Sequence, residues 1–118
     1  MSGITYSIGT WLVKPGREAE FIATWQDLAL WTEDMNVGAD EGTLVQDMAE
    51  PRRFFAFWPF ESEMGVQRLR GDPKFKEYMM RMRAYCEDSR PSTARLVGRT
   101  AGPEIVDEST LVGEKTYL

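Results

Sequence analysis

Hydrophobic and polar residues alternate along residues 4–13, which is the period of a β-strand whose two faces lie in different surroundings. Trp11 and Val13 fall on one face of this predicted strand. The other face carries Ile4, Tyr6, Ile8 and Leu12. Pro15 and Gly16 follow at once and are typical of a turn. We therefore expect the first strand to end before them.

A helix is predicted next, from Glu18 to Met35, because apolar side chains recur there at steps of three and four. Glu18 suits the positive end of the helix dipole, and Gly38 supplies a stop signal. The stripe consists of Phe21, Trp25, Leu28, Thr32 and Met35.

Two further strands are predicted at residues 43–49 and 53–60, and the short turn between them favours an antiparallel hairpin. The second of these strands is apolar on both faces. One face carries Phe55 and Phe57, and the other carries Phe54, Ala56, Trp58 and Phe60. Such a strand is usually buried on both sides. Since helices in a small α+β domain usually cover one face, we expect a second copy of the sheet on the other, and hence a homodimer.

The second helical region begins with a short segment and continues, after Asp72 as N-cap and Pro73 as first helical residue, to about Asp88. Pro91 is expected to end this helix, and residues 92–101 to form a fourth strand. The apolar stripe of the longer helix is Phe75, Tyr78, Met79, Met82 and Cys86. The order strand, helix, strand, strand, helix, strand predicts one α+β domain with an antiparallel sheet.

The length of 118 residues fits a single domain. We expect it to span residues 1–101, with a tail at 102–118 that either packs on the partner subunit or is mobile. The net charge of −5 and the scattered Lys and Arg residues argue against a nucleic-acid or anionic-membrane partner. No apolar run reaches the length of a membrane span, and the N-terminus does not resemble a signal peptide. We therefore expect a cytoplasmic protein.

The chain contains no histidine. This composition excludes His-based acid–base catalysis, His-activated nucleophiles and His ligands to metal or haem. The single cysteine, Cys86, then has no imidazole to activate it, and we interpret it as a core residue. There is no glycine-rich phosphate loop, Cys-x-x-Cys pair or clustered carboxylate metal set, so we expect no metal site.

Aromatic and sulfur-containing side chains are abundant for so short a chain, and the helix stripes and the third strand bring several of them against the sheet. Either they line an apolar pocket for a flat organic molecule or they fill a closed core. The pocket candidates are Trp11, Trp25, Trp58, Phe60, Phe75, Tyr78 and Met79.

Several short segments, in order, resemble the antibiotic biosynthesis monooxygenase (ABM) domain family. They are Val13–Glu18 with Phe21 and Trp25, Asp47 ahead of Glu50–Phe54, Phe60–Glu63, and Asp72–Phe75. The resemblance covers roughly residues 4 to 100. It implies a ferredoxin-like subunit whose sheet stacks on a second copy in a dimeric α+β barrel.

The resemblance also implies a cofactor-free monooxygenase acting on a planar aromatic or polyketide-like molecule, with no bound cofactor. Some relatives degrade haem, but the missing histidine does not support that chemistry here. No catalytic residue is marked out; Tyr6 and Tyr78 are candidate proton donors, and Asn36 and the arginines could hold an oxyanion. The alternatives are a non-catalytic small-molecule-binding protein and a dimerisation module with a filled core.

Overall fold

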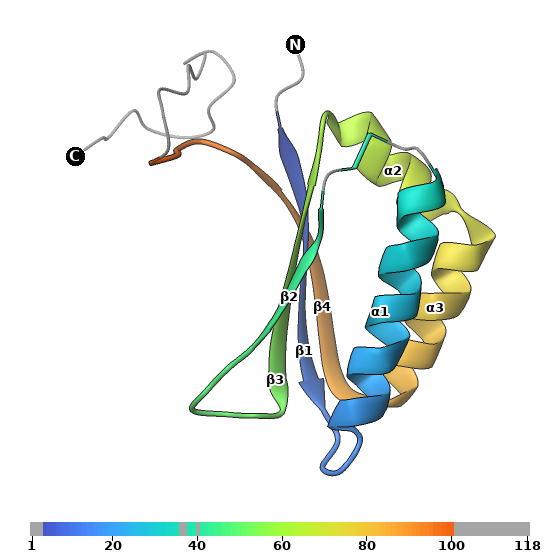
Figure 1. The fold of residues 1–118 in the computed structure, drawn as a ribbon, viewed down its shortest axis with the longest axis vertical. Helices are drawn as coiled ribbons and strands as arrows, with labels where there is room; N and C mark the ends of the chain where they lie inside the picture. Colours follow the sequence, from blue (N-terminus) through green and yellow to red (C-terminus); the bar gives the residue numbers. More distant parts are fainter. Residues whose placement is uncertain (1–3, 36–37, 40, 101–118) are drawn as a thin grey trace.

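The computed structural model describes residues 4–35, 38–39 and 41–100 of the chain. Their strands form one antiparallel sheet in the order β2-β3-β1-β4, and the helices pack on one face of it (Figure 1). The strands are β1 (Thr5–Val13), β2 (Thr43–Gln46), β3 (Arg53–Phe60) and β4 (Cys86–Arg95). The helices are α1 (Glu18–Met35), α2 (Glu63–Gly71) and α3 (Pro73–Ala84). The α+β, ferredoxin-like fold expected from the sequence is confirmed.

The bounds of α1 and β3 agree with the sequence pattern, whereas β2 is shorter than expected. It ends at Gln46 rather than at residue 49. The side chain of Asp47 accepts hydrogen bonds from the backbone N–H groups of Ala49 and Glu50, at 2.8 and 3.2 Å. This local bonding offers the backbone an alternative to the sheet ladder, so the chain turns early.

The predicted end of α3 is wrong. Asp72 does cap the helix, since its side chain accepts from Lys74 N–H at 2.8 Å, but the helix stops at Ala84 and not at Asp88. Cys86 therefore begins β4 instead of continuing the helical stripe. Pro91 lies within β4, where it pairs with Gly9. Since β4 is an edge strand, a residue without an N–H is tolerated there.

The core lies between the helices and the inner face of the sheet. Val13, Phe21 and Met82 are fully buried there, and Phe54 and Phe60 nearly so. The opposite face of the sheet carries no helix (Figure 1). It presents Tyr6, Ile8, Leu12, Val45, Phe55 and Phe57, of which Phe57 is 37% and Val45 41% exposed.

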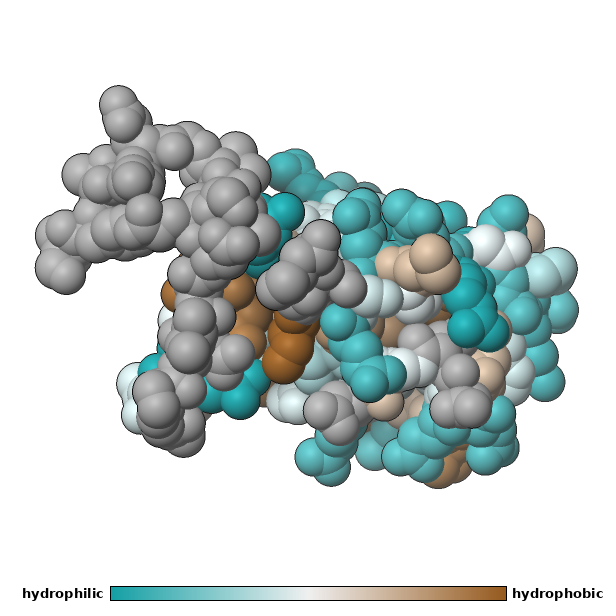
Figure 2. All heavy atoms as spheres, turned by 90° about the horizontal axis from the view of Figure 1, so that it is seen from above, coloured by the Kyte–Doolittle hydropathy of each residue, from teal (hydrophilic) through white to brown (hydrophobic). Residues whose placement is uncertain are grey.

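Seen from above, brown apolar atoms gather beside the sheet, and the surface over the helices is mostly teal (Figure 2). None of the helices in the described ranges is both long and apolar enough to cross a membrane. The predicted tail at residues 102–118 lies outside the described residues.

Candidate functional site

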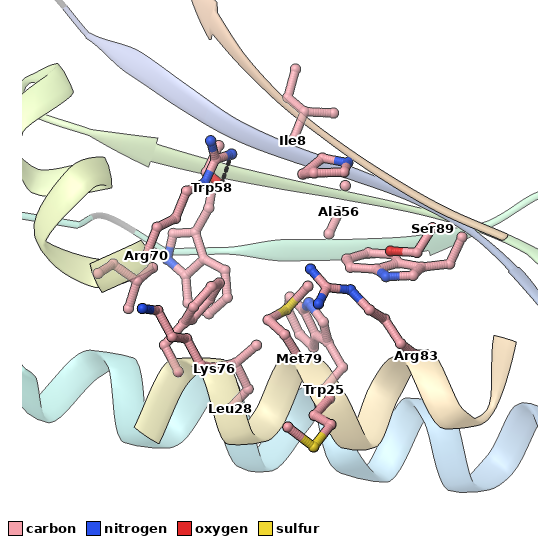
Figure 3. A pocket seen from close by; sticks show the side chains of 17 residues that line it. Ile8, Trp25, Leu28, Ala56, Trp58, Arg70, Lys76, Met79, Arg83 and Ser89 are labelled. Atoms are coloured by element: carbon pink, nitrogen blue, oxygen red, sulfur yellow. Dashed lines mark hydrogen bonds between the residues drawn. The ribbon is translucent and has the colours of Figure 1, made fainter. Parts of the chain in front are cut away.

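A cavity of about 500 Å³ lies between the inner face of the sheet and the helices. Figure 3 shows Trp25, Leu28 and Met79 rising from the helices toward the sheet, while Trp58 and Ala56 come from β3. Ile8 is also drawn, but its side chain points to the other side of the sheet. The space is therefore enclosed by two layers of secondary structure, as is common for sites that hold small organic molecules.

The floor of the cavity is made by small side chains in the middle of the sheet. Gly9 on β1 pairs with Ala56 on β3, and Ser7 lies two residues before Gly9 on the same face. A methyl group added to Gly9 would stand 2.8 Å from Cζ2 of the Trp11 indole, closer than real side chains approach. The absence of a side chain at Gly9 therefore allows the indole of Trp11 to lie flat against the strand.

The walls are aromatic. Trp25 of α1 and Trp58 of β3 pack with their ring centroids 5.5 Å apart and their planes tilted by 43°. Both side chains are only 7% exposed. Leu28, Phe75 and Met79 complete the helical side of the lining. Flat, polarisable surfaces of this kind favour the faces of an aromatic ligand over an aliphatic one.

One strong cation lies at the wall of this apolar space. Arg70, near the end of α2, reaches the sheet and donates to Ser7 Oγ at 2.9 Å, Ser92 O at 2.8 Å and Thr93 Oγ1 at 2.7 Å. The bond to Ser7 is drawn in Figure 3. Burial lowers the pKa of Arg70 below its usual value, although a guanidinium stays protonated in proteins. All three acceptors are neutral.

A second polar group is the indole nitrogen of Trp11. It is a hydrogen-bond donor that lies fully buried without a partner within the described part of the chain. Leaving such a donor unpaired in the interior costs about 1–3 kcal/mol. Other atoms of Trp11 line the cavity, so a ligand that carries an acceptor would satisfy this donor once the indole ring shifts toward the cavity.

The cavity opens to solvent between α3 and β4, where its lining residues are exposed. Lys76, Met80 and Arg83 contribute from α3, and Pro91 from β4. Figure 3 shows Arg83 directed from the helix toward the sheet near Ser89. The mouth is therefore basic.

Five of the seven pocket candidates lie together. Trp11, Trp25, Trp58, Phe75 and Met79 all line this cavity. Phe60 is 1% exposed and packs in the core without lining it. Tyr78 instead contacts Trp31 of α1, with ring centroids 5.8 Å apart. That these residues bind a substrate stays a prediction.

Of the donors suggested from the sequence, the arginines are represented in the cavity lining by Arg70 and Arg83, whereas the two tyrosines are not part of it. Tyr6 lies on the open face of the sheet, Tyr78 packs against Trp31, and Asn36 is outside the described residues. The arginines were suggested only as a group, and neither Arg70 nor Ser7 was singled out, because neither belongs to a motif. A signal was present for the floor, since Ser7 and Gly9 share a strand face with Trp11, and Ala56 shares one with Trp58.

The remaining reactive group is outside the cavity. Cys86 is half-buried at the start of β4, and burial raises the pKa of its thiol to about 11, with Lys14 opposing the change. A thiol with a raised pKa is a poor nucleophile. Among the described residues, no group of three or more Cys, Asp or Glu side chains is placed to hold a metal ion.

No protein-family model matches the sequence, and no curated protein matches it. Solved structures do share its fold. A mutant of SnoaB, a cofactor-independent oxygenase from Streptomyces nogalater, superposes with a TM-score of 0.74 at 18% identity, covering 87% of this chain and 100% of the other.

Two bacterial proteins described as candidate antibiotic biosynthesis monooxygenases are similar as well. The one from Caulobacter crescentus CB15 has a TM-score of 0.74 at 19% identity, covering 82% of this chain and 92% of its own. The one from Bordetella bronchiseptica has a TM-score of 0.71 at 21% identity, covering 80% and 98%. The ferredoxin-like subunit fold implied by the resemblance to the ABM domain is thus confirmed.

Proposed function

We propose that this chain is an ABM-type, cofactor-independent monooxygenase that oxidises a planar aromatic molecule bound in the cavity. The observation that carries the proposal is the cavity itself, about 500 Å³ in volume and walled by Trp11, Trp25 and Trp58. A chain of this size with a filled core would have no such space. The fold that it shares with a cofactor-independent oxygenase supports the same reading.

In such a reaction the substrate supplies the electrons. A ring CH₂ group next to a phenolic or keto ring is converted to a carbonyl: one atom of O₂ enters the product, and the other leaves as water with the two hydrogens of the oxidised carbon. All four electrons come from that carbon. The protein contributes orientation, exclusion of water and stabilisation of the enolate that forms when the first proton is lost.

Residues of this chain suit those tasks. The walls formed by Trp25 and Trp58 hold a flat ring system and exclude water. A shift of the indole ring would bring the unpaired N–H of Trp11 to the enolate oxygen, where charge develops. The lining includes no Asp, Glu or Cys, and the chain has no His, so the proton would pass to water at the basic mouth.

That missing base favours a second candidate function. A cavity that orients a flat molecule but offers no carboxylate or imidazole could bind a metabolite without changing it. The two candidates differ in one observable, because a binding protein gives saturable binding without oxygen consumption.

Oxygen uptake with a panel of anthrones and hydroquinones, in the presence of a metal chelator, tests the enzyme. Ala56 is 4% exposed on the cavity floor, so Ala56→Leu should fill the space and lower kcat/KM by at least about tenfold. Ala23→Leu makes the same change on the exposed side of α1 and should have no effect. Wild-type turnover that survives Ala56→Leu, or no turnover with any compound, would count against the proposal.

The open sheet face supports a homodimer as part of the same proposal. Apolar side chains such as Phe57 and Val45 are too exposed in a single chain, and a second sheet stacked on them would bury them. The active unit would then be a pair of subunits, each with its own cavity on the helical side of its sheet.

A further inference from the structure

The charges around the cavity have one sign. The chain as a whole is acidic, with a net charge of −5. The cavity lining nevertheless includes Arg70, Lys76 and Arg83 and no acidic residue. A random sample of this surface would carry more acids than bases, so the lining differs from the rest of the molecule. An electropositive, partly apolar concavity raises the local concentration of anions.

Arg70 is the member of this set that is held in place. Its three hydrogen bonds connect α2 to β1 and β4 and fix the guanidinium beside the cavity floor. A guanidinium has five N–H donors. Both protons of Nη2 and one of Nη1 are used, so the Nε proton and the second Nη1 proton have no acceptor within the part of the chain that the structure describes.

The charge of Arg70 is also uncompensated within the described residues. The ion pairs there involve Arg17, Arg52 and Arg90, each with a nearby carboxylate, but not Arg70. Arg70 is half-buried, so its guanidinium loses part of its hydration without gaining a counter-ion, which is unfavourable. An anionic ligand at this position would supply the missing partner.

Ser7 adds a neutral donor at the same place. Its Oγ accepts from Arg70, which leaves the hydroxyl proton available for another acceptor. The indole of Trp11 lies over Gly9, two residues from Ser7 on the same strand, so a ring system whose polar end is at Arg70 and Ser7 would lie beside it.

We propose that the cavity selects planar aromatic carboxylates, whose carboxylate is bound by Arg70 and Ser7 while the ring system lies between Trp58 and the residues of α1 and α3. This inference deepens the proposed function by naming the ligand class, but it requires only binding. Arg70 is then the residue that determines specificity. Lys76 and Arg83, exposed at the mouth, attract the anion without fixing it.

Isothermal titration calorimetry with 2-naphthoate and 2-naphthamide tests the proposal, because the two probes have the same ring and nearly the same shape and differ in charge. Hydrogen bonds to charged groups and close ion pairs correspond to about a 10- to 100-fold difference in affinity. The wild-type protein should therefore bind the carboxylate at least about tenfold more tightly than the amide.

Three variants locate the preference. Arg70→Gln should abolish the preference, so that 2-naphthoate and 2-naphthamide bind with similar affinity. Arg70→Lys keeps the positive charge and should retain part of the carboxylate preference. Arg68→Gln removes an exposed cation two residues earlier on α2, outside the lining, and should bind as the wild type does. If Arg70→Gln fails to fold, the proposal is still tested by the carboxylate preference of the wild type and by its reduction in Arg70→Lys.

The proposal is overturned if wild-type protein does not bind 2-naphthoate at millimolar concentration, if both probes bind equally, or if Arg68→Gln and Arg70→Gln lose the preference alike. Its failure is distinct from that of the proposed enzyme. Binding with a carboxylate preference but no oxygen uptake leaves this inference intact and removes the oxygenase. Turnover of neutral anthrones without any carboxylate preference supports the oxygenase and removes this inference.

Discussion

Replacing Gly9 by alanine tests whether the cavity floor is built as described. The new methyl group would lie 2.8 Å from Cζ2 and 2.9 Å from Cζ3 of Trp11, so the indole has to move. Trp11 is 5% exposed and packs edge-to-face on Phe21, with ring centroids 5.2 Å apart, so it has little room to retreat. Overpacking of this kind costs about 1–3 kcal/mol.

A smaller effect opposes this cost. Alanine loses less backbone entropy on folding than glycine does, which returns about 0.5–1 kcal/mol. The net loss in the free energy of unfolding should therefore be about 0.5–2 kcal/mol, which at a urea m-value of about 2 kcal/mol/M lowers the urea midpoint by roughly 0.25–1 M. Urea denaturation followed by circular dichroism measures it directly.

Two controls identify the cause. Gly71→Ala adds a methyl group at the end of α2 where no atom lies within 4 Å, and stability should stay within about 0.5 kcal/mol of the wild type. In a Trp11→Phe background, Gly9→Ala should cost clearly less, because the smaller ring leaves space. Equal cost in both backgrounds, or no cost in either, would refute the reasoning.

The remaining predictions concern Cys86 and the open sheet face. Since burial raises the pKa of Cys86 from 9.0 to about 11, alkylation by iodoacetamide at pH 8 should be about 100-fold slower in the folded protein than after unfolding. Because the folded state holds this proton more tightly, the contribution of Cys86 to the free energy of unfolding is fully present below pH 9 and is lost as the pH rises from 9 to about 11. A urea midpoint that increases over this pH interval would contradict the prediction. The wild type should show twice the 13.5 kDa chain mass by light scattering. Phe57→Glu on the sheet should shift it toward the monomer, whereas Leu30→Glu on exposed α1 should not, and a wild-type monomer at micromolar concentration would contradict the dimer.

Much of the fold could be predicted from periodicity. The apolar stripe that begins at Phe21 predicted the bounds of α1 correctly. The apolar residues of β3 likewise predicted the bounds of that strand and which side chains share each face. The transition from α3 to β4 could not be predicted, because β4 is polar on both faces and shows no alternation. Pro91 suggested a break, but an edge strand accommodates it.

The candidate site was predictable only in its apolar part. The large aromatic residues stand out by composition, and Trp11, Trp25 and Trp58 lie where helix stripe and strand meet. Arg70 looks like any solvent-facing arginine of a short helix, and it becomes distinctive only when α2 places its guanidinium over Ser7 and the edge strand. Contacts between residues 63 positions apart have no local signature.

Oxidation of an anthrone carboxylate under ¹⁸O₂ tests the central claim most directly, with the product analysed by mass spectrometry and Ala56→Leu as the blocked control. The account predicts that the wild type, without added metal or cofactor, inserts one labelled oxygen atom into each product molecule, and that Ala56→Leu does so at least about tenfold more slowly. Product that carries oxygen from water, or labelled product formed as fast by Ala56→Leu as by the wild type, would contradict it.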